Sequence, residues 1–428
     1  MSPFMVRKHL FLACFLSTVA HADGIKLGVD VLQNDSFGIL AGKKVGLVVH
    51  PASVNSEMVS TVEVFRQTDR CKLIALFGPE HGVYGDEYAG IPVGDRTDSH
   101  TGLPVRSLYG KNRKPNPEML KGLDALIFDL QDIGSRSYTY ISTMKLCLEA
   151  CAETGIEFVV LDRPNPLGGK RIEGPMLEKG FESFIGELPV PYLHGMTMGE
   201  LAQLVKEDKF PHYQKLHVVK MSGWKRSMMW DDTGLRWVPT SPHIPLASTC
   251  AAYAATGILG ELGQLSNGVG YPQPFELIGA PWITAESLTE ALNRYWQNPE
   301  VYNRSSKKEF QPPQVSPCPK GIQFRPARYK PFYGMFKGQG CEGAQIYLNP
   351  RDAETLIEIN FRVLVALDAP KLFRQAAREE IRMFDQACGT DEPRKWLTEN
   401  RNLGMLFERW KTICGKFRET RQKFLLYE

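Results

Sequence analysis

Three polar loops carry most of the side chains in this sequence that could act on a substrate. The first is Gly78-Pro79-Glu80-His81-Gly82, and the second runs from Asp129 through Asp132 to Arg136. The third is Asp162-Arg163-Pro164-Asn165-Pro166. With two nearby tyrosines, these loops supply the following candidate site residues: Glu80, His81, Asp129, Asp132, Arg136, Tyr138, Tyr140, Asp162, Arg163 and Asn165.

These side chains suit a small polar substrate such as a sugar. Carboxylates and Asn hydrogen-bond hydroxyl groups, and Arg pairs with a carboxylate or phosphate. Glycoside hydrolysis needs one carboxyl group that stays protonated and a second group that acts at the anomeric carbon. Glu80 is the expected acid, because a Gly-Pro turn presents it rigidly and a nearby apolar strand end would favour its protonated form.

The loops need a sheet that brings their ends together. Short apolar runs at 45–49, 73–77, 125–130 and 158–161 are typical of strands buried on both faces. Helical periodicity at 57–67 and 141–153 separates them, which predicts a mostly parallel sheet with crossover helices. Because the carboxyl ends of such strands lie on one edge, where ligands bind, we expect the three loops to converge.

Two domains are expected from the length and the pattern. A chain of 428 residues rarely forms a single core. A proline-rich stretch at 239–245 predicts the boundary. We therefore expect a mostly parallel α/β domain over 23–243 and a smaller α+β domain over 244–428.

Residues 1–22 are expected to be a secretory signal peptide. Arg7 and Lys8 precede an apolar run at 10–16, and Ala20-His21-Ala22 has the small residues of a cleavage site. The mature protein is then exported, to the periplasm or the extracellular space. The spacing of its cysteines does not define a disulfide pairing, and none has Cys-x-x-Cys spacing.

Composition and motifs exclude several other classes. A net charge of +3 is too small for a nucleic-acid binder, and no run beyond the N-terminus is long enough to span a membrane. Neither a dinucleotide fingerprint nor a Walker motif is present, so we expect no cofactor. We expect no metal, because no two of His81, His194, Asp132 and Asp162 have recognised ligand spacing.

Each loop also has a purely structural interpretation. Gly78, Pro79 and Gly82 could form a tight turn that leaves Glu80 in solvent. Asp162 could serve only to cap a turn beside Arg163. The convergence of all three loops favours a site.

The motifs together resemble the exo-β-N-acetylmuramidase family of the NamZ type, which was long catalogued as a domain of unknown function. Besides the three loops, the matching motifs are His194-Gly195-Met196-Thr197-Met198-Gly199-Glu200, Pro274-Phe275-Glu276 and Leu425-Leu426-Tyr427. They occur in order over nearly the whole chain. The resemblance implies a hydrolase that removes terminal N-acetylmuramic acid from the non-reducing end of peptidoglycan fragments. It also implies a Rossmann-like first domain whose site lies in a cleft against the second.

The resemblance places the catalytic pair on Glu80 and Tyr138, with Tyr140 two residues away. The other candidates would then bind the substrate, and Arg136 or Arg163 would pair with the lactyl carboxylate of N-acetylmuramic acid. The expected substrate-binding residues are His81, Asp132, Arg136, Tyr140, Asp162, Arg163 and Asn165. Two positions depart from the family: Asn267 replaces a usual Glu and Val269 a usual Arg, which bears on substrate preference.

Three rival functions fit the same sequence. An exported solute-binding protein would also have two α/β lobes and would bind a sugar or a muropeptide without turnover. A metal-dependent hydrolase would use His81 and the aspartates. A catalytically decayed homologue is consistent with the departures at Asn267 and Val269.

Overall fold

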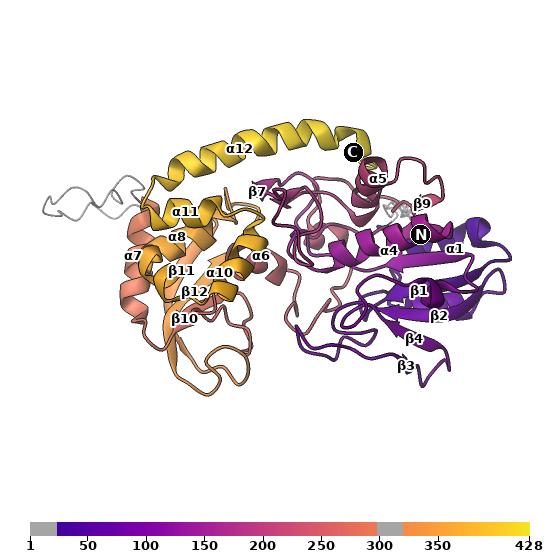
Figure 1. Cartoon of the computed structure of the whole chain (residues 1–428), viewed down its shortest axis with the longest axis horizontal. Coiled ribbons are helices and arrows are strands. Elements are labelled where there is room, and N and C mark those ends of the chain that lie inside the picture. Colours follow the sequence, from indigo (N-terminus) through magenta and orange to yellow (C-terminus); the bar gives the residue numbers. More distant parts are fainter. Residues whose placement is uncertain (1–23, 298–319) are drawn as a thin grey trace, which may run out of the picture.

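A computed structural model of the chain describes residues 24–297 and 320–428 (Figure 1). The expected signal peptide lies outside the described residues. The first domain is built on a seven-stranded sheet in the order β3-β4-β2-β1-β5-β6-β9, in which only the β3–β4 pair is antiparallel. Its strands are β1 (Lys44–Val49), β2 (Lys72–Gly78), β3 (Arg96–Thr97), β4 (Pro104–Ser107), β5 (Ala125–Asp129), β6 (Glu157–Leu161) and β9 (Leu216–Val219).

The central strands bury both faces, as their continuous apolar runs predict. On one face, Leu47, Ile127 and Val159 belong to the apolar core under α1 (Gly28–Asn34) and α2 (Thr61–Arg66). On the other, Phe128 and Phe158 pack with α4 (Tyr140–Thr154) and α5 (Met198–Lys209). A short helix, α3 (Pro117–Leu120), precedes β5. The expected parallel α/β architecture is therefore confirmed.

Local sequence signals explain several helix boundaries. Thr197 and Glu200 form the capping box of α5, and Gly155 ends α4 in a left-handed conformation with φ 71°. The helix expected at 57–67 begins only at Thr61, because the Ser60 side chain accepts a hydrogen bond from the Glu63 amide and so caps the helix there.

The second domain combines a small antiparallel sheet with helices. The sheet has the order β10-β12-β11, formed by β10 (Leu277–Ala280), β12 (Cys341–Leu348) and β11 (Ile322–Tyr329). Its helices are α6 (Thr249–Gly260), α7 (Ala285–Gln297), α8 (Glu358–Ala366), α9 (Ala369–Gln375), α10 (Arg378–Cys388), α11 (Glu392–Thr398) and α12 (Leu403–Thr420). A two-stranded ribbon, β7 (Glu173–Met176) with β8 (Pro191–Leu193), lies in sequence between β6 and β9 of the large sheet.

The end of the chain returns to the first domain. Helix α12 runs from the second domain back along β7 to the region of α5 (Figure 1, yellow). Beyond it, the Tyr427 hydroxyl donates to Asp162 at 2.6 Å, and the Leu426 amide donates to Glu200 at 2.8 Å. The Glu428 carbonyl accepts from the Arg226 amide at 2.7 Å. The last residues therefore complete the corner of the first domain between α5 and β9.

Two further findings concern the described residues as a whole. No helix among them is long and apolar enough to cross a membrane. Seven cysteines within them are buried free thiols: Cys71, Cys147, Cys151, Cys250, Cys341, Cys388 and Cys414. These side chains act as small apolar core residues.

Candidate active site between the two domains

A cavity of about 320 Å³ lies where the carboxyl edge of the large sheet meets the second domain. The first domain contributes the loop after β2 and the residues that lead into α4. The second contributes the end of α6 and the loop that follows it. The lining residues include Glu80, His81, Ser137, Tyr138, Thr139, Ser241, His243, Tyr253, Gly260, Glu261, Asn267, Val269 and Phe275.

Glu80 is held firmly at the edge of this cavity. It lies two residues after the end of β2 and is only 8% exposed. One carboxylate oxygen accepts from the Thr139 hydroxyl at 2.7 Å, and the other accepts from the Gly90 amide at 3.1 Å. Both oxygens thus have a donor, which fixes the direction of the carboxylate, and Glu80 does not lie free in solvent as a simple turn residue would.

Replacing Thr139 with Val tests this anchoring. Valine matches the shape of threonine but removes the hydroxyl donor, so we expect a folded protein whose kcat/KM is lowered roughly 10-fold, the effect of losing about 1.4 kcal/mol of positioning. Thr139→Ser keeps the hydroxyl and should stay near the wild-type rate. Equal activity of the Val and Ser variants would contradict a role for this hydrogen bond.

Tyr138 and Tyr140 form a pair of rings behind Glu80. Tyr138 lines the cavity, and its hydroxyl is 2.8 Å from the Thr240 hydroxyl. Tyr140 begins α4, and its hydroxyl donates to the Thr240 carbonyl at 2.7 Å. The ring centroids are 4.8 Å apart in a T-shaped contact. The structure therefore brings Tyr138 to the cavity and places Tyr140 as its buried support, fully covered by protein.

His81 adopts a strained backbone conformation at the cavity wall. Its φ of 71° is unusual for a residue with a side chain, and such strain is commonly kept at functional sites. Its Nδ1 atom is 2.8 Å from the Glu87 carbonyl, which leaves Nε2 available. The His243 ring lies 6.1 Å away in a T-shaped contact and also lines the cavity.

Asp132 lies beneath the site and not on its surface. One carboxylate oxygen accepts from the Gly134 amide at 2.7 Å, and the other has no partner among the described residues. His194 is 4.0 Å away, and burial lowers its pKa to about 3, which leaves the ring neutral. Burial raises the pKa of Asp132 from 3.8 to about 7.

This raised pKa predicts how stability changes with pH. The unfolded chain loses the Asp132 proton near pH 4, whereas the folded protein keeps it until about pH 7. The stabilising contribution of the group is therefore complete below pH 4 and disappears as the pH rises to 7. Asp132→Asn is neutral in both states, so between pH 5 and pH 8 the wild type should lose roughly 2–3 kcal/mol of unfolding free energy relative to the variant. Urea unfolding at several pH values measures this, and parallel curves would contradict it.

Arg136 does not reach the cavity. Its side chain is fully buried and donates to four backbone carbonyls. Two belong to the region of β7 and β8, namely Pro175 and Val190, both at 2.8 Å. The other two, at 3.1 and 2.6 Å, belong to Ala387 and Cys388 at the end of α10. Arg136 therefore joins the two domains, and its donors are directed to the chain and not to a substrate.

Three residues of the third loop likewise point away from the Glu80 cavity. Arg163 pairs with Asp129 at 2.6 and 2.9 Å. Asp162 accepts from Thr197, Gly199 and Tyr427. Asn165 donates to the Met196 carbonyl and accepts from the Leu167 amide. These contacts hold the loop, α5 and the C-terminal tail together.

Several lining residues were not singled out by the sequence. Glu261 and Tyr253 come from the second domain, and Ser241 and His243 come from the proline-rich stretch that predicts the domain boundary. Position in the chain gives no sign that the end of α6 faces the loop after β2. The one signal available was the glycine-rich segment around Glu261, since close turns often accompany sites.

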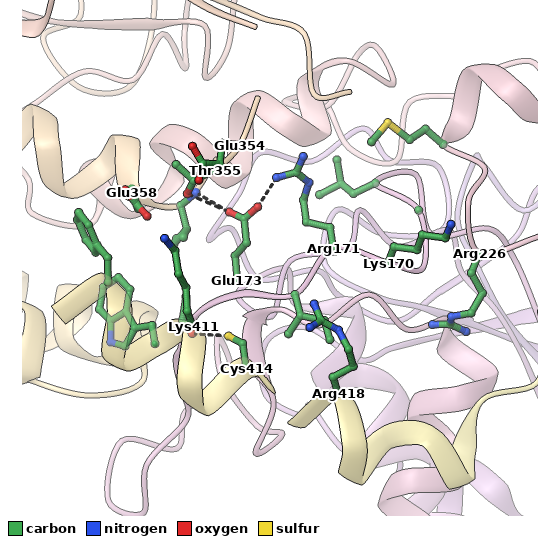
Figure 2. A pocket seen from close by; sticks show the side chains of 18 of the residues that line it. Lys170, Arg171, Glu173, Arg226, Glu354, Thr355, Glu358, Lys411, Cys414 and Arg418 are labelled. Atoms are coloured by element: carbon green, nitrogen blue, oxygen red, sulfur yellow. Dashed lines mark hydrogen bonds and ion pairs between the residues drawn. The ribbon is translucent and has the colours of Figure 1, made fainter. Parts of the chain in front are cut away.

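A second, larger cavity of about 410 Å³ lies under α12 and contains none of the expected site residues. In Figure 2, Arg171 and Glu173 point toward each other across it, and Lys411, Cys414 and Arg418 come from α12. Glu173 also accepts from the Leu356 amide at 2.8 Å. These contacts join β7 to the second domain, and the cavity lies along that junction.

No group of three or more His, Cys, Asp or Glu residues suited to a metal ion occurs within 24–297 and 320–428. The carboxyl groups Glu80 and Glu261, which come from different domains, line one cavity together with the Tyr138 phenol. Paired carboxyl groups in one cavity of a two-domain α/β protein are typical of a glycoside hydrolase.

The chain belongs to the exo-β-N-acetylmuramidase NamZ family. The family model of the N-terminal domain matches residues 45–248, and that of the C-terminal domain matches residues 251–427. The peptidoglycan β-N-acetylmuramidase NamZ of Bacillus subtilis (strain 168) is 40% identical over 405 residues, which are 94% of this chain and 91% of that protein. The expected family is thus confirmed.

Two solved structures share the fold. One is a DUF1343 family protein from Bacteroides fragilis NCTC 9343 solved at 1.65 Å, with 42% identity and a TM-score of 0.82 over 94% of this chain and 99% of that chain. The other, from the same strain and solved at 1.30 Å, has 24% identity and a TM-score of 0.69 with the same coverage, which shows the fold alone.

Proposed function

We propose that this protein is an exported exo-β-N-acetylmuramidase that removes terminal N-acetylmuramic acid from the non-reducing end of peptidoglycan fragments. Membership of the NamZ family and the 40% identity to the Bacillus subtilis enzyme support the reaction. Export rests on the expected signal peptide at residues 1–22, which lies outside the described residues.

The single observation that carries the proposal is the placement of Glu80 and Tyr138 in one cavity between the domains. Both belong to the loops at the carboxyl edge of the sheet, and each is oriented by a hydroxyl group, that of Thr139 or of Thr240. Hydrolysis of a glycoside passes through a transition state with positive charge at the anomeric carbon. An anchored carboxylate beside a phenol oxygen stabilises such a charge.

Tyr138 acts here as a stabilising phenol. Burial raises its pKa well above the ordinary value, so the hydroxyl stays protonated at neutral pH and the phenolate needed for direct attack is scarce. Its lone pairs remain available to the developing charge, and the hydrogen bond with Thr240 fixes their direction. Glu80 and Tyr138 are thus our proposed catalytic residues.

A histidine, and not an arginine, is the donor available to the substrate carboxylate in this cavity. None of the described residues that line the cavity is Lys or Arg, and Val269 stands at the position where the family usually has Arg. His243 lies in the wall, and when its Nδ1 accepts from the Tyr333 hydroxyl its Nε2–H can donate to the lactyl carboxylate. The His81 Nδ1–H already goes to the Glu87 carbonyl, so its neutral ring offers Nε2 as an acceptor for a substrate hydroxyl. Asn267 offers an amide to the hydroxyls or the acetamido group.

Product analysis with residues 23–428 tests the proposal. Fragments that begin with N-acetylmuramic acid at the non-reducing end should release that sugar, which mass spectrometry identifies, while fragments that begin with N-acetylglucosamine should stay intact. Release of para-nitrophenol from its β-N-acetylmuramide should persist in a strong chelator. Binding of N-acetylmuramic acid without turnover of either substrate would instead support a solute-binding protein or a decayed homologue.

A further inference from the structure

Glu261 is a second carboxyl group in the site, and it comes from the other domain. It is the residue that ends α6, and its side chain lines the same cavity as Glu80. The sheet edge supplies Glu80 and the second domain supplies Glu261, so the two domains each contribute one carboxyl group to the cavity. Most glycosidases use a pair of carboxyl groups as their catalytic residues.

The backbone around Glu261 is fixed by close packing. A Cβ atom on Gly260 would lie 2.7 Å from the Asn267 amide nitrogen, so the loop after α6 folds directly onto the residue before Glu261. A Cβ atom on Gly263 would lie 2.2 Å from a Glu380 carboxylate oxygen, and φ there is 68°. Glycine allows both close approaches without displacing these side chains, and the positive φ of Gly263 favours it further.

The two carboxyl groups have opposite surroundings. Glu80 accepts a hydrogen bond at each oxygen. Within the part of the chain that the structure describes, the Glu261 side chain has no hydrogen bond and no ion pair. Burial, followed by the negative charge of Glu80, raises the pKa of Glu261 from 4.5 to about 7. The other titratable groups that face it are Tyr192, Tyr253 and Cys388.

Such a difference between neighbouring carboxyl groups is how glycosidases divide the work of acid and base. With a pKa of about 7, Glu261 is protonated in about half of the molecules at neutral pH and can give that proton away. Glu80 has both oxygens held by donors, which orients it to accept a proton from water. The sequence interpretation gave the acid role to Glu80, and the surroundings in the structure favour the reverse.

We propose that Glu261 is the proton donor to the leaving group and that Glu80 is the base. The Glu261 proton moves to the glycosidic oxygen as the bond from the anomeric carbon to that oxygen breaks, and the electron pair of this bond goes to the oxygen. The leaving sugar departs as an alcohol. Water forms the new bond to the anomeric carbon and gives its proton to Glu80. This inference rests on the proposed function and adds the residue that completes its chemistry.

Comparing leaving groups tests the assignment. A sugar alcohol is a poor leaving group and needs a proton, whereas 2,4-dinitrophenolate leaves without one. Glu261→Gln should therefore lose roughly 1,000-fold in kcat/KM on a disaccharide that ends in N-acetylmuramic acid. On the 2,4-dinitrophenyl β-N-acetylmuramide it should lose less than about 10-fold. Glu80→Gln should lose activity on both substrates.

A matched control and the wild-type pH profile complete the design. Glu276→Gln removes a partly buried carboxyl group in the same domain that does not line the cavity, and it should leave both rates unchanged. The wild type should lose activity on the disaccharide as the pH rises through about 7, with no such loss on the dinitrophenyl substrate. This second measurement needs no variant to fold.

The outcomes separate clearly. If Glu261→Gln lost the same factor on both substrates, the assignment of Glu261 as the proton donor would be wrong. It would also be wrong if Glu80→Gln, and not Glu261→Gln, lost activity on the disaccharide alone. Neither result would affect the proposed muramidase activity. Full activity of Glu261→Gln on the disaccharide would also overturn the assignment of Glu261. If the wild type turned over neither substrate, the proposed function and this inference would both be wrong.

Discussion

Glu80→Gln should leave a folded protein with almost no activity. Gln has the shape of Glu, and its side-chain oxygen can still accept from the Thr139 hydroxyl or the Gly90 amide. It cannot accept a proton and carries no negative charge for the anomeric carbon. We expect kcat/KM to fall roughly 1,000-fold or more on every β-N-acetylmuramide, measured by release of the free sugar or of nitrophenol.

Binding and stability should change little in the same variant. The thermal unfolding midpoint should stay close to that of the wild type, and N-acetylmuramic acid should still raise it. Glu118→Gln, at an exposed glutamate on α3, is the matched control and should keep full activity. A Glu80→Gln protein that turns over substrate normally would remove Glu80 from the reaction.

Arg136→Met should give the largest loss of stability among the site candidates. Methionine fills much of the same volume but leaves four buried carbonyls, those of Pro175, Val190, Ala387 and Cys388, without their donors. Because each unpaired buried polar group is costly, we expect the free energy of unfolding to fall by roughly 3–5 kcal/mol in urea titrations.

The loss should also loosen the contact between the domains, since two of these carbonyls belong to α10 and two to the first domain. Arg66→Met removes an exposed arginine that pairs with Glu63 on the same helix, and it should cost less than about 1 kcal/mol. If the two variants were equally stable, the view of Arg136 as a buried bridge would be wrong.

The sequence predicts the scaffold well and the roles of its charged residues poorly. Continuous apolar runs identify the central strands, and a parallel sheet must place the loops after β2, β5 and β6 on one edge. That edge does carry Glu80 and Tyr138 to the cavity. Periodicity and sheet topology suffice for this result because they depend on residues close in sequence.

Arg136 and Arg163 show why the rest was missed. An arginine that binds a substrate carboxylate and one that binds carbonyls or a buried aspartate have the same sequence signature. What separates them is the partner, which for Arg136 lies more than 250 residues away at Cys388. Glu261 presents the same difficulty, since its place in the same cavity as Glu80 depends on how the second domain packs against the first.

The return of the chain to its first domain has a consequence for biosynthesis. Asp162 and Glu200 belong to the first domain, but they receive hydrogen bonds from Tyr427 and Leu426, which lie more than 220 residues later in the chain. A nascent chain cannot finish this corner until residues 426 and 427 have left the ribosome. A purification tag fused after Glu428 would begin beside that late contact, because the Glu428 carbonyl already binds the Arg226 amide. A tag in front of residue 24 leaves that contact undisturbed.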